Sequence, residues 1–501
     1  MRPACAGLFL VDIYSGRWYN YHVQIFAEIR LCFFRRFVMA KKKKVKRSNI
    51  PLLVILLLIT GACSAAAFYG YMKNRPAEND TALPQTVKQE SEKPSVSDDG
   101  QGSSAEENAS SQNTDDTQMP KDAPAEKPSD NAVQADVKSD AKQDKSDTAE
   151  AAVSDDARIN ELVANMTLHD KICQMFIVTP ESLTGYSLVT ESGLATLESL
   201  KKYPVGGLIY FSENLESKDQ AKTMISATQE SNSEVSDIPL FISVDEEGGV
   251  VARCAEKLGT TEFSPMYTYR AEGVDKAYSN AYTIAQDIAS LGFNLDFAPV
   301  ADTWSNPDNS VIGTRAYSDD FSETAELVAS AVKGFSDGGV ACTIKHFPGH
   351  GDTAEDSHIG MACSYKTIAE LEKQEYLAFE SGIAAGADMV MVGHITMVNV
   401  DNMPASLSKT FITDELRNKL GFDGIIITDA LGMGALSNYY SSDEIAVEVV
   451  RAGGDILLMP ADLSRAVTGI ENAVASGEIT EQRINESVVR ILELKKKRGI
   501  L

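Results

Sequence analysis

From about residue 157 onward, short apolar runs alternate with longer segments in which apolar residues recur three and four positions apart. The runs are typical of strands buried on both faces, and the segments between them have the period of amphipathic helices. We predict eight strands, over 175–178, 207–211, 240–244, 295–300, 341–344, 389–392, 424–428 and 456–459. We predict helices over 190–202, 217–231, 275–290, 322–337, 367–385, 411–420, 442–451, 463–476 and 481–497.

Eight alternating strand and helix units predict an α/β fold, a (β/α)8 barrel over residues 157–501. A doubly wound open sheet is the alternative, because continuous apolar strands suit both folds. Polar residues follow almost every predicted strand, which favours the barrel, since a barrel keeps its chemistry at the carboxyl ends of its strands. The residues at these strand ends are Asp245, Asp302, His346, His394, Asp429 and Pro460.

The stretch just before this region, residues 76–156, contributes −13 to the formal net charge of −26. Residues 76–156 hold 20 acidic residues and 7 lysines, with no aromatic residue and no Ile. Such a segment cannot bury enough apolar surface to offset the entropy of ordering, so we predict a disordered acidic linker. The acidic balance also argues against nucleic acid as a partner.

A basic segment near the N-terminus precedes an uncharged apolar run over 50–72, which is long enough to span a bilayer. We expect Met39 to be the true start, with 1–38 an upstream over-extension, and we expect 39–75 to be a transmembrane or signal segment. Lipidation of Cys63 is a third interpretation of this segment. Under each of them the barrel is exported, either anchored to the membrane in the cell envelope or secreted.

Neither a metal nor a cofactor is expected. His346 and His350 stand four residues apart, but Pro348 and Gly349 between them exclude the helix that a metal pair at this spacing needs. The sequence has no dinucleotide fingerprint and no glycine-rich phosphate loop before a helix. The four cysteines beyond residue 157 show no paired spacing, and we interpret them as buried apolar side chains.

The segment from Lys345 to His358 directly follows the predicted strand at 341–344 and holds three of the six histidines. Asp356 and His358 stand two residues apart, so in an extended loop their side chains point the same way. The carboxylate can then orient the imidazole as a general acid and base. A solvated surface pair is the alternative.

Other strand ends offer groups that suit a polyhydroxylated ligand. Asp245 and Arg253 follow one strand, and Arg315 lies in the segment after the next. Lys345 and His346 suit hydrogen bonds to hydroxyl groups, because a Lys is costly to bury without a polar partner.

Asp429 directly follows four β-forming residues, which puts its carboxylate at the predicted barrel mouth. It can be a nucleophile or an electrostatic stabiliser there. The alternative is that it caps the next helix.

Together these motifs resemble glycoside hydrolase family 3, specifically the single-domain form of its β-N-acetylhexosaminidase branch. The resemblance covers about 160–500. The matching stretches are Lys-His-Phe-Pro-Gly-x-Gly followed by Asp-x-His at 345–358, Asp-x-Glu-Gly-Gly at 245–249, Asp-Phe-Ala-Pro-Val-x-Asp at 296–302, Ile-Gly-x-Arg at 312–315, and Ile-Thr-Asp with Leu-x-Met at 427–433.

The resemblance implies a retaining exo-acting enzyme that removes terminal β-linked N-acetylglucosamine, in particular from peptidoglycan fragments. Asp429 would form a covalent glycosyl-enzyme, and His358, oriented by Asp356, would act first as acid and then as base. We expect the barrel to be monomeric. The residues expected to bind the sugar are Asp245, Arg253, Arg315, Lys345 and His346.

One departure from the family pattern is Val250, where many relatives carry Arg. Three alternatives stay open: a β-glucosidase of the same family, a phosphorolytic N-acetylglucosaminidase, and an inactive glycan-binding module tethered at the surface.

Overall fold

A computed structural model describes residues 157–354, 356–357 and 360–501 of the chain. The predictions for 1–38, 39–75 and 76–156 lie outside the described residues and stay predictions. Within the described part, no helix is both long and apolar enough to cross a membrane.

Eight parallel strands form the predicted barrel, and each predicted strand is present. They hydrogen-bond in the order β10-β1-β2-β3-β4-β5-β7-β9. A parallel bridge between Ile427 and Ile456 brings β9 back to the segment that leads into β10, so the ring is nearly closed. The strands are β1 Phe176–Val178, β2 Gly207–Ile209, β3 Phe241–Val244, β4 Leu295–Asp296, β5 Ala341–Phe347, β7 Met389–Val392, β9 Ile425–Thr428 and β10 Leu457–Leu458.

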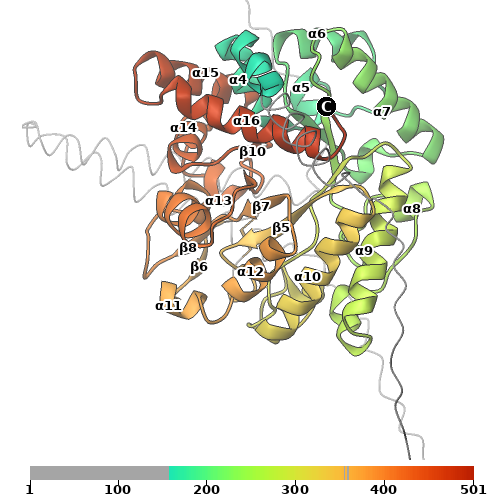
Figure 1. Cartoon of the computed structure of the whole chain (residues 1–501), viewed down its shortest axis with the longest axis vertical. Coiled ribbons are helices and arrows are strands. Elements are labelled where there is room, and N and C mark those ends of the chain that lie inside the picture. The colour runs from blue at the N-terminus through green and yellow to red at the C-terminus, as the bar shows by residue number, and fades with distance from the viewer. Residues whose placement is uncertain (1–156, 355, 358–359) are drawn as a thin grey trace, which may run out of the picture. The chain divides into compact units, whose positions relative to one another are not determined.

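Helices surround these strands, as Figure 1 shows. Their apolar stripes pack on the strands, and every residue of these eight strands is buried. The helices are α4 Leu168–Gln174, α5 Pro180–Thr184, α6 Leu194–Lys202, α7 Lys218–Ser233, α8 Ala255–Leu258, α9 Val274–Ala289, α10 Phe321–Asp337, α11 Ile368–Leu371, α12 Tyr376–Ala384, α13 Gly434–Ser437, α14 Ser442–Ala452, α15 Leu463–Ala475 and α16 Glu481–Lys497.

Two strands differ from their predicted bounds by more than two residues. β4 ends at Asp296, because Pro299 follows and has no N–H to donate to a ladder. β5 continues through Lys345 and His346 to Phe347, so these two site residues belong to the strand and not to the loop after it. The pairing of β5 with β7 is irregular at His346, which stands between the paired residues Lys345 and Phe347.

Two short strands are absent from the prediction, and two predicted helices differ from it. β6 Ala362–Ser364 and β8 Ile395–Met397 pair in a second, two-stranded parallel sheet. This small sheet joins the segment after β5 to the segment after β7, near the carboxyl ends of both strands. The predicted helix at 411–420 is a π-helix over Thr410–Lys419, and the predicted helix at 367–385 is divided into α11 and α12.

The last helix, α16, packs against the amino ends of the strands. Arg490 of α16 lies 3.0 Å from the carboxylate of Asp455, two residues before β10. Lys497 and Arg498 bind the carboxylate of Asp388, the residue before β7. Because these pairs occupy the amino end of the barrel, the carboxyl end is left for the site.

Candidate active site

Lys345 lies inside the barrel mouth between two carboxylates. Its Nζ is 2.7 Å from Asp245 Oδ1 and 2.7 Å from Glu247 Oε1. Burial lowers the pKa of Lys345, but the charges of Asp245 and Glu247 outweigh burial and raise that pKa above its ordinary value. The ammonium is therefore charged near neutral pH and is held in one place.

Glu247 also holds Arg315. Its carboxylate accepts hydrogen bonds from Arg315 Nε at 2.9 Å and from Nη2 at 2.8 Å, a two-pronged contact that fixes the plane of the guanidinium. Burial would raise the pKa of Glu247, but the charges of Arg315 and Lys345 keep it well below its usual range. Three of the five predicted sugar-binding residues, Asp245, Arg315 and Lys345, are thus joined in one ion-pair cluster.

His346 is held by a different carboxylate. Its Nδ1 is 2.7 Å from Asp302 Oδ2, and its peptide N–H donates to the same oxygen at 3.1 Å. The irregular pairing of β5 lets Lys345 and His346 both serve the site, although neighbouring strand residues normally face opposite sides. Asp302 binds Nδ1 and so presents the Nε2 edge of His346 to a ligand.

Asp429 follows β9 directly and is partly exposed. Its Oδ1 accepts the N–H of Ala430 at 2.7 Å. Burial would raise the pKa of Asp429, but the imidazoles of His394 and His346, the Ala430 N–H and Lys345 together lower it to about 2. The carboxylate is therefore ionised at neutral pH, as a nucleophile must be.

The alternative that Asp429 caps a helix is wrong. The next helix, α13, begins at Gly434, and Met433 occupies the position before its first residue. Asp429 thus stands at the strand end without a helix to stabilise.

Arg253 lies near the rim but outside the ion-pair cluster. Its guanidinium carbon is 5.8 Å from the ring centre of Phe211, which follows β2. Glu246 accepts the peptide N–H of Arg253 and that of Cys254, so this carboxylate holds the backbone that carries the arginine. Arg253 Nε has no hydrogen-bond partner among the described residues.

The predicted acid and base pair is described only in part. His358 lies outside the described residues, so its pairing with Asp356 stays a prediction. Asp356 is partly buried, and the neighbouring Ser357 is buried. The carbonyl of Ser357 accepts the N–H of Ala435 at 3.2 Å, which ties this loop to α13, the helix that follows Asp429.

His346 and His350, weighed as a metal pair, have other partners. Asp302 binds Nδ1 of His346. The two ring nitrogens of His350 lie 2.8 Å from Thr353 Oγ1 and 2.9 Å from Ser357 Oγ. In the described part of the chain, no group of three or more His, Cys, Asp or Glu side chains is arranged to hold a metal ion.

Three site residues received no role from the sequence. Glu247 bridges Lys345 and Arg315, Asp302 orients His346, and His394 lies beside Asp429 with Nε2 2.9 Å from the carbonyl of Ala430. Asp302 and His394 stand at predicted strand ends, so their place at the rim was predictable. The residues that they contact lie on or after other strands, and these contacts could not be predicted from the sequence.

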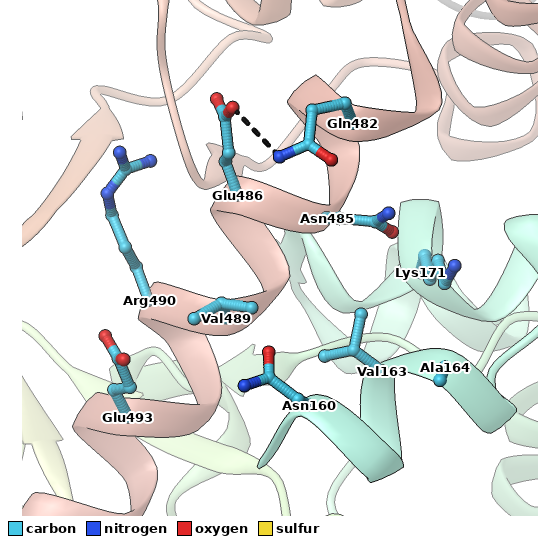
Figure 2. Close-up of a pocket in the computed structure, with 10 residues that line it drawn as sticks. All are labelled: Asn160, Val163, Ala164, Lys171, Gln482, Asn485, Glu486, Val489, Arg490 and Glu493. Carbon is cyan, nitrogen blue, oxygen red and sulfur yellow. Dashed lines mark hydrogen bonds between the residues drawn. The ribbon is translucent and has the colours of Figure 1, made fainter. Parts of the chain in front are cut away.

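A polar groove lies elsewhere, between α16 and the helical residues 157–165 (Figure 2). Gln482 and Glu486 are hydrogen-bonded on its α16 side at 3.4 Å. Arg490, which also lines the groove, binds Asp455 at the amino end of the barrel. The groove is therefore separate from the predicted site.

Comparison with known proteins agrees with this geometry. Residues 167–494 match the glycosyl hydrolase family 3 N-terminal domain. Beta-hexosaminidase A of Pseudoalteromonas piscicida is 34% identical over 326 residues, which are 60% of this chain and 54% of that protein. This chain thus spans about half the length of that relative. A beta-hexosaminidase of Stenotrophomonas maltophilia is 35% identical over 265 residues, 51% of this chain and 76% of that protein.

Among solved structures, a family 3 beta-N-acetylglucosaminidase from a Paenibacillus species superposes with a TM-score of 0.63 at 37% identity. That match covers 67% of this chain and 63% of the other. The barrel, the ionised carboxylate after β9 and the match over 167–494 lead to one conclusion. The chain belongs to glycosyl hydrolase family 3.

Proposed function

We propose that this chain is a retaining exo-β-N-acetylhexosaminidase that removes terminal β-linked N-acetylglucosamine. The observation that carries the proposal is Asp429, an ionised carboxylate at a strand end beside His346 and His394. The beta-hexosaminidases that the chain resembles, and the family 3 beta-N-acetylglucosaminidase fold neighbour, support the choice of sugar.

In the proposed reaction Asp429 attacks the anomeric carbon and forms a glycosyl-enzyme, while the glycosidic C–O bond breaks and the leaving-group oxygen takes a proton from His358. Water then attacks the same carbon as His358 takes a proton from it, and the bond to Asp429 breaks. Asp356 orients His358 in both steps. The roles of His358 and Asp356 rest on the sequence motif.

The remaining residues bind the sugar in this proposal. Lys345 and Arg315 offer N–H donors, and Asp245 accepts hydrogen bonds from hydroxyl groups. Their mutual ion pairs hold these groups in place before the substrate arrives, which lowers the entropic cost of binding. His346 and Arg253 complete the proposed set.

Hydrolysis of p-nitrophenyl N-acetyl-β-glucosaminide by the whole chain tests the proposal, with the corresponding glucoside beside it. We expect turnover of the N-acetyl sugar alone, with net retention of the anomeric configuration. Turnover of the glucoside alone would instead indicate a β-glucosidase. A sugar phosphate formed only in phosphate buffer would indicate phosphorolysis, and turnover of neither substrate would indicate a glycan-binding module.

We further propose that peptidoglycan fragments are the natural substrate and that the barrel acts in the cell envelope or outside the cell. The support is the basic and apolar composition of residues 39–75 and the acidic composition of 76–156. Cell fractionation with an antibody to the barrel tests the location, and recovery only in the cytoplasm would contradict it.

A further inference from the structure

His350 uses all of its hydrogen-bonding groups inside the barrel mouth. Its peptide N–H donates to Asp302 Oδ1 at 2.6 Å, and its carbonyl accepts from Asn309 Nδ2 at 2.7 Å. Its ring nitrogens bind the hydroxyls of Thr353 and Ser357. Only 2% of the residue is exposed, so these bonds are shielded from water.

The two hydroxyls belong to opposite ends of one loop. Thr353 stands at the start of the loop, and Ser357 stands between Asp356 and His358. The imidazole of His350 therefore spans the loop from the inside. It is neutral near neutral pH, because burial first and the charge of His346 second lower the pKa of His350 below its ordinary value. A neutral ring donates through one nitrogen and accepts through the other, so it can bind both hydroxyls at once.

The start of the loop, next to Thr353, is itself held in place by contacts with residues 303–306. Asn306 Nδ2 donates to the carbonyl of Asp352 at 3.2 Å, and the peptide N–H of Asn306 donates to that of Gly351 at 3.1 Å. A Cβ at Gly351 would lie 1.7 Å from the carbonyl oxygen of Thr303, so the backbone of Gly351 packs against that of Thr303 with no room for a side chain. The far end is fixed as well, because the carbonyl of Ser357 accepts the N–H of Ala435.

We propose that His350 is a positioning residue, which holds Ser357 through Nε2 and thereby sets where the two residues beside Ser357 meet the substrate. The inference rests on the proposed function, since those two residues are the proposed acid and base pair. His350 does not touch the substrate, and its effect passes through Ser357.

The test compares two substrates that need the acid to different extents. The phenolate of phenyl N-acetyl-β-glucosaminide is a poor leaving group and must be protonated as it departs. The dinitrophenolate of the dinitrophenyl glycoside departs without protonation. We expect Ser357→Ala and His350→Phe each to lower kcat/KM for the phenyl glycoside by roughly 10-fold or more, and for the dinitrophenyl glycoside by less than about 3-fold. The double variant should lose no more kcat/KM for the phenyl glycoside than the weaker of the two single variants does, because both changes remove the same hydrogen bond.

Ser487→Ala is the matched control. Like Ser357, Ser487 is buried and its hydroxyl makes a hydrogen bond, which it donates to Asp455 at the amino end of the barrel. We expect Ser487→Ala to affect both substrates equally. Equal losses for both substrates in Ser357→Ala, or additive losses in the double variant, would overturn the proposal.

Backbone hydrogen exchange separates this proposal from the proposed function. We expect the amides of 353–357 to exchange at least about 10-fold faster in His350→Phe and Ser357→Ala, and at the wild-type rate in Ser487→Ala. If the wild-type chain cleaves neither glycoside, the proposed function fails and the exchange rates alone decide whether His350 holds the loop. Unchanged exchange in the two loop variants would overturn the positioning role.

Discussion

The carboxylate of Glu247 meets the guanidinium of Arg315 edge to edge, 2.9 Å from Nε and 2.8 Å from Nη2. The same carboxylate lies 2.7 Å from the ammonium of Lys345. One buried acid on the segment after β3 therefore positions two cations that come from different parts of the chain. Without the Glu247 carboxylate, each of these buried cations would lose a partner of opposite charge.

Changing Glu247 to Gln should therefore destabilise the protein by about 3 kcal/mol, because removing one partner of a buried ion pair leaves the other uncompensated. The Michaelis constant for the N-acetyl sugar should also rise, since Lys345 and Arg315 lose their fixed positions. Urea unfolding and steady-state kinetics measure the two effects. Glu198→Gln, in an exposed pair with Lys201, is the control and should change neither. Wild-type stability in Glu247→Gln would show that the cluster is not held by this charge.

Replacing Asp429 with Asn should lower kcat at least about 1,000-fold while leaving the unfolding midpoint close to that of the wild type. An amide cannot form the glycosyl-enzyme, although it has nearly the same shape. Asp423→Asn is the control, because Asp423 is exposed just before the same strand. A trapping substrate with a slow second step should label the wild type at Asp429, as read by peptide mass spectrometry. Labelling of another carboxylate would remove Asp429 from the nucleophile's role.

Lys495 provides a test of pH dependence away from the site. Burial lowers the pKa of Lys495 to about 7, well below its ordinary value. The unfolded chain then binds more protons than the folded chain between pH 7 and the ordinary lysine pKa, so stability should rise with pH in that range. Between about pH 7 and pH 9 the wild type should gain roughly 2 kcal/mol from this group.

Lys495→Met should abolish this gain, because it leaves no group to titrate. The measurement is the free energy of urea unfolding at intervals up to about pH 9, where buried thiols such as Cys342, whose pKa burial raises to about 12, begin to act in the opposite direction. Parallel curves for the variant and the wild type would contradict the prediction.

Gly351→Ala should displace the loop after β5, because the new Cβ would lie 1.7 Å from the carbonyl oxygen of Thr303. We expect a loss of about 1–3 kcal/mol in stability, with a loss of activity larger than the unfolded fraction explains. Gly193→Ala is the matched control, since a Cβ at Gly193 meets no atom within 4 Å. Circular dichroism and kinetics at one temperature measure both effects, and full activity in Gly351→Ala would show that the loop tolerates the shift.

The barrel was predictable because apolar runs in buried parallel strands are continuous and easily recognised. The positions at which the strands end were harder to predict. Pro299 shortened β4, while β5 continued through Lys345 and His346, polar residues that a pattern of apolar positions assigns to a loop. β6 is three residues long, too short to show a period.

The site was predictable as a set of residue types but not as a set of contacts. Lys345, Arg315 and Asp245 were expected to bind one ligand, and they share one cluster. Glu247, which joins them, looked like one of three consecutive acids. Its role depends on the arrival of two cations from later segments, which no local pattern reveals.

The pairing of β10 with β1, through Phe176 and Leu457, has a consequence for synthesis. β1 is made first and exposes one unpaired edge until the last strand arrives. At a translation rate of roughly 5–20 residues per second, that edge waits for on the order of 15–60 seconds. An open strand edge is where other chains can add, so the interval before ring closure is when a nascent chain of this protein most needs a chaperone.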